Sequence, residues 1–147
     1  MTNEEFIKIL DKKGYSYEIE GDKIIVTGRN VSLNFPTSLP PGVVFKNVGT
    51  VELRSLTSLS TGVEFKNGGD VDLDSLTSLP PDVVFRNRGD VRLESLTSIS
   101  PDVVFRNKGD VDLKSLAGGW FKDWSGNIDG IDSKRLLSLM INKGVFI

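Results

Sequence analysis

The stretch SLTSLPPDVVFRNRGDVRLESLTSISPDVVFRNKGDV, residues 75 to 111, runs through nearly the same 20-residue pattern twice. Shifting the whole chain against itself by 20 residues extends the pattern over residues 31 to 116 and aligns four apolar columns and one asparagine column. The columns are Val31, Val51, Val71, Val91 and Val111; Leu33, Leu53, Leu73, Leu93 and Leu113; Leu39, Leu59, Leu79 and Ile99; Phe45, Phe65, Phe85 and Phe105; and Asn47, Asn67, Asn87 and Asn107. A fixed period of this length is typical of a solenoid, in which repeats stack because none can bury its apolar side alone.

Each repeat contains two segments in which apolar and polar residues alternate, such as VDLDSL and VVFRNRGD. Alternation with a period of two is typical of β-strands. The prolines of SLPPD predict a turn between these segments, and the glycines at 49, 69, 89 and 109 predict a second bend. We therefore expect a mainly β, single-domain β-solenoid with two short strands per coil. About five coils, separated by the roughly 4.8 Å between neighbouring strands, would make a rod about 24 Å long.

The asparagine column has two possible roles in such a coil. Buried asparagines in register could hydrogen-bond from one coil to the next, or each side chain could close the turn of its own coil. Both roles remain open from the sequence.

The two ends of the chain depart from the repeat and are expected to cap the solenoid, because exposed strand edges invite aggregation. Residues 1 to 30 predict an N-terminal cap, in which a helix with Thr2 and Glu5 as a capping box precedes a hairpin over YSYEIEGDKIIVT. The repeat solenoid occupies residues 31 to 116. Residues 117 to 147 are expected to form a C-terminal cap made of the last coil and a helix.

The C-terminal cap contains the segment GGWFKDWSGNIDGID, residues 118 to 132, which is dense in residues that do not repeat. Trp120 and Trp124 in this segment are expected to cover the last coil. If they are exposed, the tryptophan pair is a candidate aromatic anchor for a partner, because buried tryptophans often dominate binding energy at interfaces.

The composition excludes several classes of function. The chain has 147 residues, a formal net charge of -2, and neither cysteine nor histidine, so disulfides, thiolate metal sites and histidine chemistry are absent. We expect no metal and no cofactor. The N-terminus lacks the features of a secretory signal and no apolar run reaches membrane-spanning length, so we expect a cytoplasmic protein without membrane association. Repeated positions do not supply the unique set of groups that catalysis needs, and we therefore expect no enzymatic activity.

The motif SLTSLP following VDLD is similar to the short leucine-rich repeats of bacterial proteins, in which Leu-x-x-Leu-Pro follows a strand. The consensus V-x-L-x-S-L-T-S-L-P-x-x-V-x-F-x-N-x-G-D resembles a leucine-rich-like β-solenoid repeat of uncharacterised bacterial and phage proteins. Leu76 stands where the familiar leucine-rich pattern carries asparagine, which favours a straighter two-stranded coil over a horseshoe. The resemblance implies a role in protein interaction and brings no catalytic residues with it.

Outward positions of the Val-x-Leu segment carry charges of both signs. Between adjacent coils we expect pairs of opposite charge, each stabilising the stack by a few tenths to about 1 kcal/mol. These pairs are Arg54 with Asp74, Asp72 with Arg92, Arg92 with Asp112, and Glu94 with Lys114.

One outward column of the second segment instead carries charges of one sign, and this column is the centre of the candidate binding stripe. Like charges on adjacent strands destabilise a sheet, so something is expected to offset them. Either Asp70, Asp90 and Asp110 at the neighbouring corner neutralise the stripe, or the stripe binds an acidic protein surface or the phosphates of a nucleic acid. The stripe consists of Lys46, Lys66, Arg86, Arg88, Arg106 and Lys108, together with the outward residues Val44, Val84 and Val104.

From these features we expect a non-catalytic repeat scaffold that mediates protein-protein interaction, as a phage or bacterial accessory protein would. Two alternatives remain open: a structural component that self-associates, and a nucleic-acid or phosphate binder that uses the basic column. Nucleic acid is the weaker alternative, because no aromatic residues interleave with the basic column to stack on bases. The sequence does not identify the partner or the oligomeric state.

Overall fold

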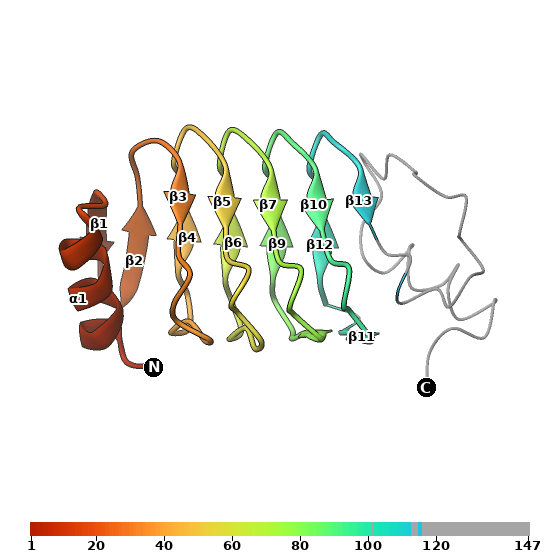
Figure 1. Ribbon diagram of the computed structural model, residues 1–147, viewed down its shortest axis with the longest axis horizontal. Helices are drawn as coiled ribbons and strands as arrows, with labels where there is room; N and C mark the ends of the chain where they lie inside the picture. The colour runs from red at the N-terminus through yellow and green to blue at the C-terminus, as the bar shows by residue number, and fades with distance from the viewer. Residues whose placement is uncertain (101, 113–114, 116–147) are drawn as a thin grey trace.

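A computed structural model describes residues 1 to 100, 102 to 112 and 115 of the chain. It shows a mainly β protein in which parallel strands from successive repeats stack into a solenoid, with one helix and one hairpin before the first coil (Figure 1). The predicted β-solenoid is therefore confirmed.

The N-terminal cap forms as the sequence predicts. Helix α1 spans Asn3–Lys13, and its first turn is capped by the Thr2 hydroxyl, which accepts a hydrogen bond from the Glu5 backbone N–H at 3.1 Å. Gly14 ends the helix in the left-handed conformation, with φ of 75°. Strands β1 (Tyr17–Glu20) and β2 (Lys23–Val26) follow as an antiparallel hairpin, and β2 joins the first coil.

Two parallel ladders make the body of the solenoid. In both ladders neighbouring strands from consecutive repeats are in register with a shift of 20 residues, as Val71 opposite Val91 and Phe65 opposite Phe85 illustrate. The five-stranded sheet contains β3 (Val31–Ser32), β5 (Val51–Glu52), β7 (Val71–Asp72), β10 (Val91–Arg92) and β13 (Val111–Asp112). The six-stranded sheet contains β1, β2, β4 (Val44–Phe45), β6 (Glu64–Phe65), β9 (Val84–Phe85) and β12 (Val104–Phe105).

A third, two-stranded sheet adds to the two strands per coil that the sequence predicts. It pairs β8 (Ser78–Leu79) with β11 (Ser98–Ile99). Each of these strands has one outward serine and one buried apolar residue, which is too short a pattern for alternation to reveal a strand.

The core lies between the sheets and consists of the inward columns. Phenylalanine rings stack from coil to coil, with centroids 5.0–5.2 Å apart and planes within 3–6° of parallel. Phe65 and Phe85 are fully buried, and Val71 and Val91 of the opposite sheet belong to the same core cluster. Inward residues of both sheets therefore share one interior, so the outward residues of the two sheets lie on opposite sides of the solenoid.

The asparagine column fills both of the roles that the sequence left open. The Asn67 side-chain amide donates to the Gly49 carbonyl of the preceding coil at 3.0 Å, and to the carbonyls of Gly69 and Asp70 in its own turn at 3.1 and 3.0 Å. Asn47, Asn87 and Asn107 repeat this arrangement, and all four side chains are buried. Each asparagine therefore both closes a turn and joins two coils.

The glycine column at the second bend is required by the close approach of neighbouring coils. A Cβ atom on Gly89 would lie 2.8 Å from the backbone nitrogen of Asp70 and would also meet its carboxylate. This contact, rather than a left-handed backbone, explains why the repeat carries glycine there.

The predicted C-terminal cap lies outside the described residues, and so do its helix and the candidate anchor Trp120 and Trp124. Among the described residues, no helix has the length and apolar character needed to cross a membrane.

Candidate interaction surface

Strand alternation places the predicted basic stripe on the outer face of the six-stranded sheet. Phe65 and Asn67 point into the core, so Lys66 between them points outward, and the same holds in each repeat. All the cationic side chains of the stripe are exposed, as predicted: Lys46, Lys66, Arg86, Arg88, Arg106 and Lys108.

The valines beside these cations differ in exposure. Val84 and Val104 are half-buried between the charged positions, while Val44 is buried and only 4% exposed. Val44 alternates with the inward Phe45 and lies outside the core cluster, and its ladder neighbour Ile25 in the capping hairpin is also buried. The stripe is therefore a row of cations with an apolar margin that begins at the third coil of the sheet.

Among the described residues, one ion pair involves the stripe. Lys66 Nζ lies 3.0 Å from Glu64 Oε2, and both side chains remain partly exposed. Pairs of this kind contribute little stability because water and salt screen them. The other cations of the stripe form no ion pair with any described residue.

The corner aspartates, which the sequence offered as intramolecular neutralisers of the stripe, make a different set of contacts. Asp70 Oδ1 accepts a hydrogen bond from the Asp90 backbone N–H at 2.8 Å, and Asp90 Oδ1 accepts one from the Asp110 backbone N–H at 2.9 Å. Within the described part of the chain, no ion pair joins these carboxylates to the stripe. Their oxygens instead link one coil to the next along the corner.

The opposite side of the solenoid carries an excess of carboxylates, which the sequence reasoning missed. We call this surface, the outer face of the five-stranded sheet and its adjoining corner, the acidic face. It contains eight carboxylates against the two guanidinium groups of Arg54 and Arg92. The carboxylates are Glu52, Asp70, Asp72, Asp74, Asp90, Glu94, Asp110 and Asp112.

The partner predicted for Arg54 on this face is wrong. Arg54 Nε lies 2.7 Å from Asp72 Oδ2 instead of pairing with Asp74. Arg54 follows the end of β5, so its long side chain lies in the turn and reaches the last residue of β7. Asp72 is buried and raises the pKa of Arg54 through this hydrogen bond.

The other expected pairs are partly borne out. Arg92 is the strand neighbour of both Asp72 and Asp112, as predicted, but Asp72 forms its ion pair with Arg54 and not with Arg92. The expected pair of Glu94 with Lys114 cannot be described, because Lys114 lies outside the described residues.

Asp74 lies close to the carboxylates of Asp72 and Glu94 on this face. Burial raises its pKa to about 6, assisted by hydrogen bonding to Asp72 and by the nearby charges of Asp72 and Glu94, while Arg92 acts in the opposite direction. The Asp74 backbone N–H donates to Asp72 Oδ1 at 3.2 Å.

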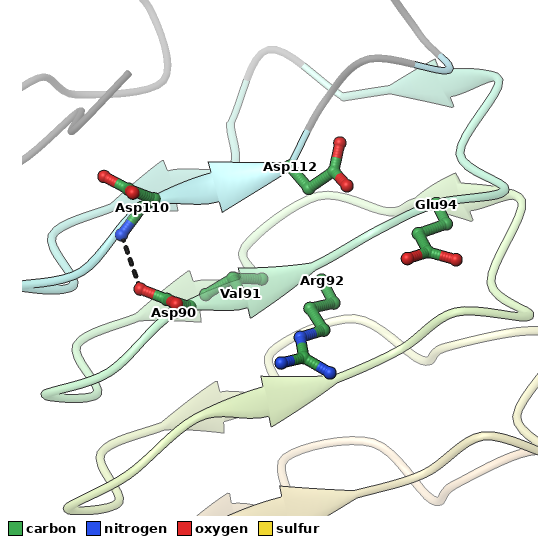
Figure 2. A pocket seen from close by; sticks show the side chains of 6 residues that line it. All are labelled: Asp90, Val91, Arg92, Glu94, Asp110 and Asp112. Carbon is green, nitrogen blue, oxygen red and sulfur yellow. Dashed lines mark hydrogen bonds between the residues drawn. The ribbon is translucent and has the colours of Figure 1, made fainter. Parts of the chain in front are cut away.

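The acidic face is hollowed at two places that are two coils apart. One hollow, of about 190 Å³, is lined by Asp90, Arg92, Glu94, Asp110 and Asp112, with Val91 at its base (Figure 2). The other, of about 120 Å³, is lined by residues 40 positions earlier and also by Arg92, so that Glu52, Asp70 and Asp72 lie beside Arg54 and Arg92. Among the described residues, no group of three or more acidic side chains is arranged to hold a metal ion.

The sequence contained a signal for the acidic face. Adding the charges of the Asp70, Asp90 and Asp110 column to those of the neighbouring strand positions would have revealed the excess of carboxylates. The pairs within the strand alone suggested that positive and negative charges balance.

Comparisons of the chain with protein-family models, with curated proteins and with solved structures find no match.

Proposed function

We propose that this chain is a non-catalytic repeat scaffold that binds an acidic protein surface through the basic stripe. The observation that supports the proposal is a row of exposed cations, of which Lys66 alone has an ion-pair partner among the described residues. The acidic corner residues Asp70 and Asp90 use carboxylate oxygens for coil-to-coil hydrogen bonds instead.

The stripe carries a cost to the fold. Adjacent coils repeat every 5.0–5.2 Å at the phenylalanine column, so each cation of the central column has like-charged neighbours on the adjoining coils. Like charges at such positions destabilise a sheet by a few tenths of a kcal/mol or more per pair, on the order of what a favourable pair contributes. A partner that places carboxylates along the stripe would offset this repulsion and gain affinity from it.

The surroundings of the cations favour a protein over a nucleic acid. Val84 and Val104 lie half-buried beside the cations, and Val48 is 76% exposed at the same edge. Apolar side chains among charges suit the mixed surface of a protein partner. Stacking of bases would require aromatic side chains, and the described stripe has none.

A charge-alternation variant, Lys46→Glu/Arg86→Glu, separates binding from folding. With these two substitutions the four positions of the central column, one on each of four consecutive coils, would alternate between negative and positive charge. Repulsion between neighbouring coils then becomes attraction, and the melting temperature should rise. Binding of a fluorescent oligoglutamate peptide, measured by anisotropy at low salt, should weaken by about tenfold or more, equivalent to about 1.4 kcal/mol.

The matched control is Lys8→Glu/Lys12→Glu, which makes the same change in net charge on the exposed side of α1. This control should bind oligoglutamate nearly as the unaltered chain does. If the stripe variant becomes more stable and binds as well as the control, the stripe is not a binding site. A single-stranded DNA oligonucleotide tested in parallel should bind more weakly than oligoglutamate, and the reverse order would favour a nucleic-acid binder.

A further inference from the structure

We infer that the acidic surface recognised by the basic stripe is the acidic face of a second copy of this chain. This inference rests on the proposed function and names its partner. Six exposed cations lie on one side of the solenoid, one of them paired with Glu64, and eight carboxylates lie on the other, offset by two guanidinium groups. Each copy therefore carries a surface and the complement of that surface, on opposite sides of one core.

The two surfaces also match in spacing, because the same coils build both. Each repeat adds one rung to each sheet with the same 20-residue shift, so cations and carboxylates recur at the same interval. Two solenoids lying side by side and parallel would keep this match along their whole length. An unrelated acidic protein would match only by coincidence.

The spacing of the two hollows on the acidic face matches the spacing of alternate cations in the basic stripe. The two hollows are related by 40 residues, which is two coils, or about 10 Å at the usual strand spacing. Lys46 and Arg86 of the stripe are also two coils apart, as are Lys66 and Arg106. One alternate pair of cations from a second copy can therefore reach both hollows. Carboxylates predominate in the first hollow, and the second holds three carboxylates beside two guanidinium groups.

The size of the surfaces sets the strength of the contact. Four coils span roughly 20 Å, and about six residues of extended chain across the face span roughly 20 Å, so each copy would bury roughly 400 Å². This lies below the roughly 800 Å² per partner of standard stable interfaces. The association should therefore be weak, dependent on concentration and reversed by salt.

The arrangement of the faces also sets the form of the assembly. A contact between the stripe of one copy and the acidic face of the next leaves one stripe and one acidic face unused at the ends. Contacts of this heterologous kind do not close on themselves unless a rotation brings the ends together. We therefore expect rows of solenoids that grow with concentration, instead of a closed dimer.

Two complementary variants of the full chain test the inference. The stripe variant Lys46→Glu/Arg86→Glu keeps the acidic face, and the face variant Glu52→Lys/Glu94→Lys keeps the stripe. Both substituted positions of the face variant adjoin carboxylates, since Glu52 pairs in the ladder with Asp72 and Glu94 lies close enough to raise the pKa of Asp74. Glu52 also accepts a hydrogen bond from Ser32 and lies near Arg54, so circular dichroism would verify that the introduced lysines leave the fold intact.

Sedimentation velocity at about 20 mM and about 500 mM salt gives the readout, with loading concentrations from roughly 10 µM to 1 mM. The unaltered chain should grow in mass with concentration at low salt and stay monomeric at high salt. Each variant alone should stay monomeric at low salt. An equimolar mixture of the two should form a species of at least two chains, because the intact stripe of the face variant meets the intact acidic face of the stripe variant.

Two outcomes would overturn the inference. Either the unaltered chain stays monomeric throughout, or it assembles while the mixture of variants stays monomeric. If in either case the stripe still binds oligoglutamate and the stripe variant does not, the proposed function stands and its partner is another protein. Loss of both self-association and oligoglutamate binding would remove the proposed function as well.

Discussion

The Tyr15 hydroxyl bonds to both backbone groups of Ser32: it donates to the carbonyl at 2.9 Å and accepts from the N–H at 3.0 Å. Ser32 belongs to β3, the first strand of the five-stranded sheet, so this side chain satisfies an edge that no earlier strand covers. The hairpin covers the first coil of the other sheet, where β2 pairs with β4. The N-terminal cap thus protects the two ladders by two different means.

Removing the Tyr15 hydroxyl should weaken this end of the solenoid. We expect Tyr15→Phe to lower the free energy of unfolding by about 1 kcal/mol, since two backbone groups lose their partner but can reach water. Tyr17→Phe is the matched control, because the Tyr17 hydroxyl donates to Asp11 Oδ1 at 2.9 Å, which is a side chain of α1 and not a backbone group of β3. Urea unfolding of both variants provides the measurement, and equal effects would show that the edge contact adds nothing of its own.

The buried asparagine column should be far more sensitive than any surface position. In Asn67→Asp the shape is kept, but the donor that serves the carbonyls of Gly49, Gly69 and Asp70 is lost. A buried carboxylate facing three carbonyl oxygens should cost at least about 3 kcal/mol in urea unfolding. Asn34→Asp, at an exposed position, controls for the added charge and should change stability by less than about 0.5 kcal/mol. Similar losses in the two variants would contradict the role assigned to the column.

The turn before the six-stranded sheet offers a substitution that should stabilise the fold. Asp82 has φ of 63°, whereas the equivalent positions in earlier coils are Gly42 and Gly62, with φ of 74° and 73°. A residue with a Cβ atom is strained in this conformation, so Asp82→Gly should add about 0.5–1 kcal/mol to the free energy of unfolding. Asp82→Ala removes the charge but keeps Cβ and should not stabilise. If both variants stabilise equally, the charge and not the backbone is responsible.

The features that the sequence could predict are those that depend on the repeat alone. In a parallel, in-register stack every residue lies over the one 20 positions earlier, so the Phe65 and Phe85 contact, the buried Asn67 and the exposure of Lys66 all follow from period and alternation. Contacts of side chains that follow the end of a strand could not be predicted from the repeat. Arg54 reaches Asp72 across a turn whose shape the pattern does not define.

The candidate site was predictable to the same extent. The position of the stripe followed from alternation, but its lack of intramolecular ion pairs with the corner did not. The position of the corner carboxylate depends on the Asp90 backbone N–H, which donates a hydrogen bond to Asp70 Oδ1. Backbone geometry at a turn, which a one-dimensional pattern does not contain, therefore sets where one oxygen of the corner carboxylate is held.

Asp74 should make stability depend on pH in an identifiable window. Its pKa is raised to about 6 by burial and by Asp72 and Glu94, so the folded state holds a proton that the unfolded state has released. The contribution of Asp74 to stability is therefore fully present below about pH 4 and is lost as the pH rises through about 6.

Asp74→Asn isolates this effect because asparagine has nearly the shape of the protonated acid. At pH 7 the variant should be more stable than the unaltered chain, by on the order of 1 kcal/mol once solvent screening is allowed for. The difference should shrink towards zero as the pH falls from about 6 to about 4, where Asp74 itself is protonated. Urea unfolding at several pH values gives both curves, and Asp82→Asn, on an exposed turn, serves as the control. A difference that stays constant from about pH 4 to about pH 7 would mean that Asp74 does not carry the raised pKa, and that the carboxylates around it share the proton in another way.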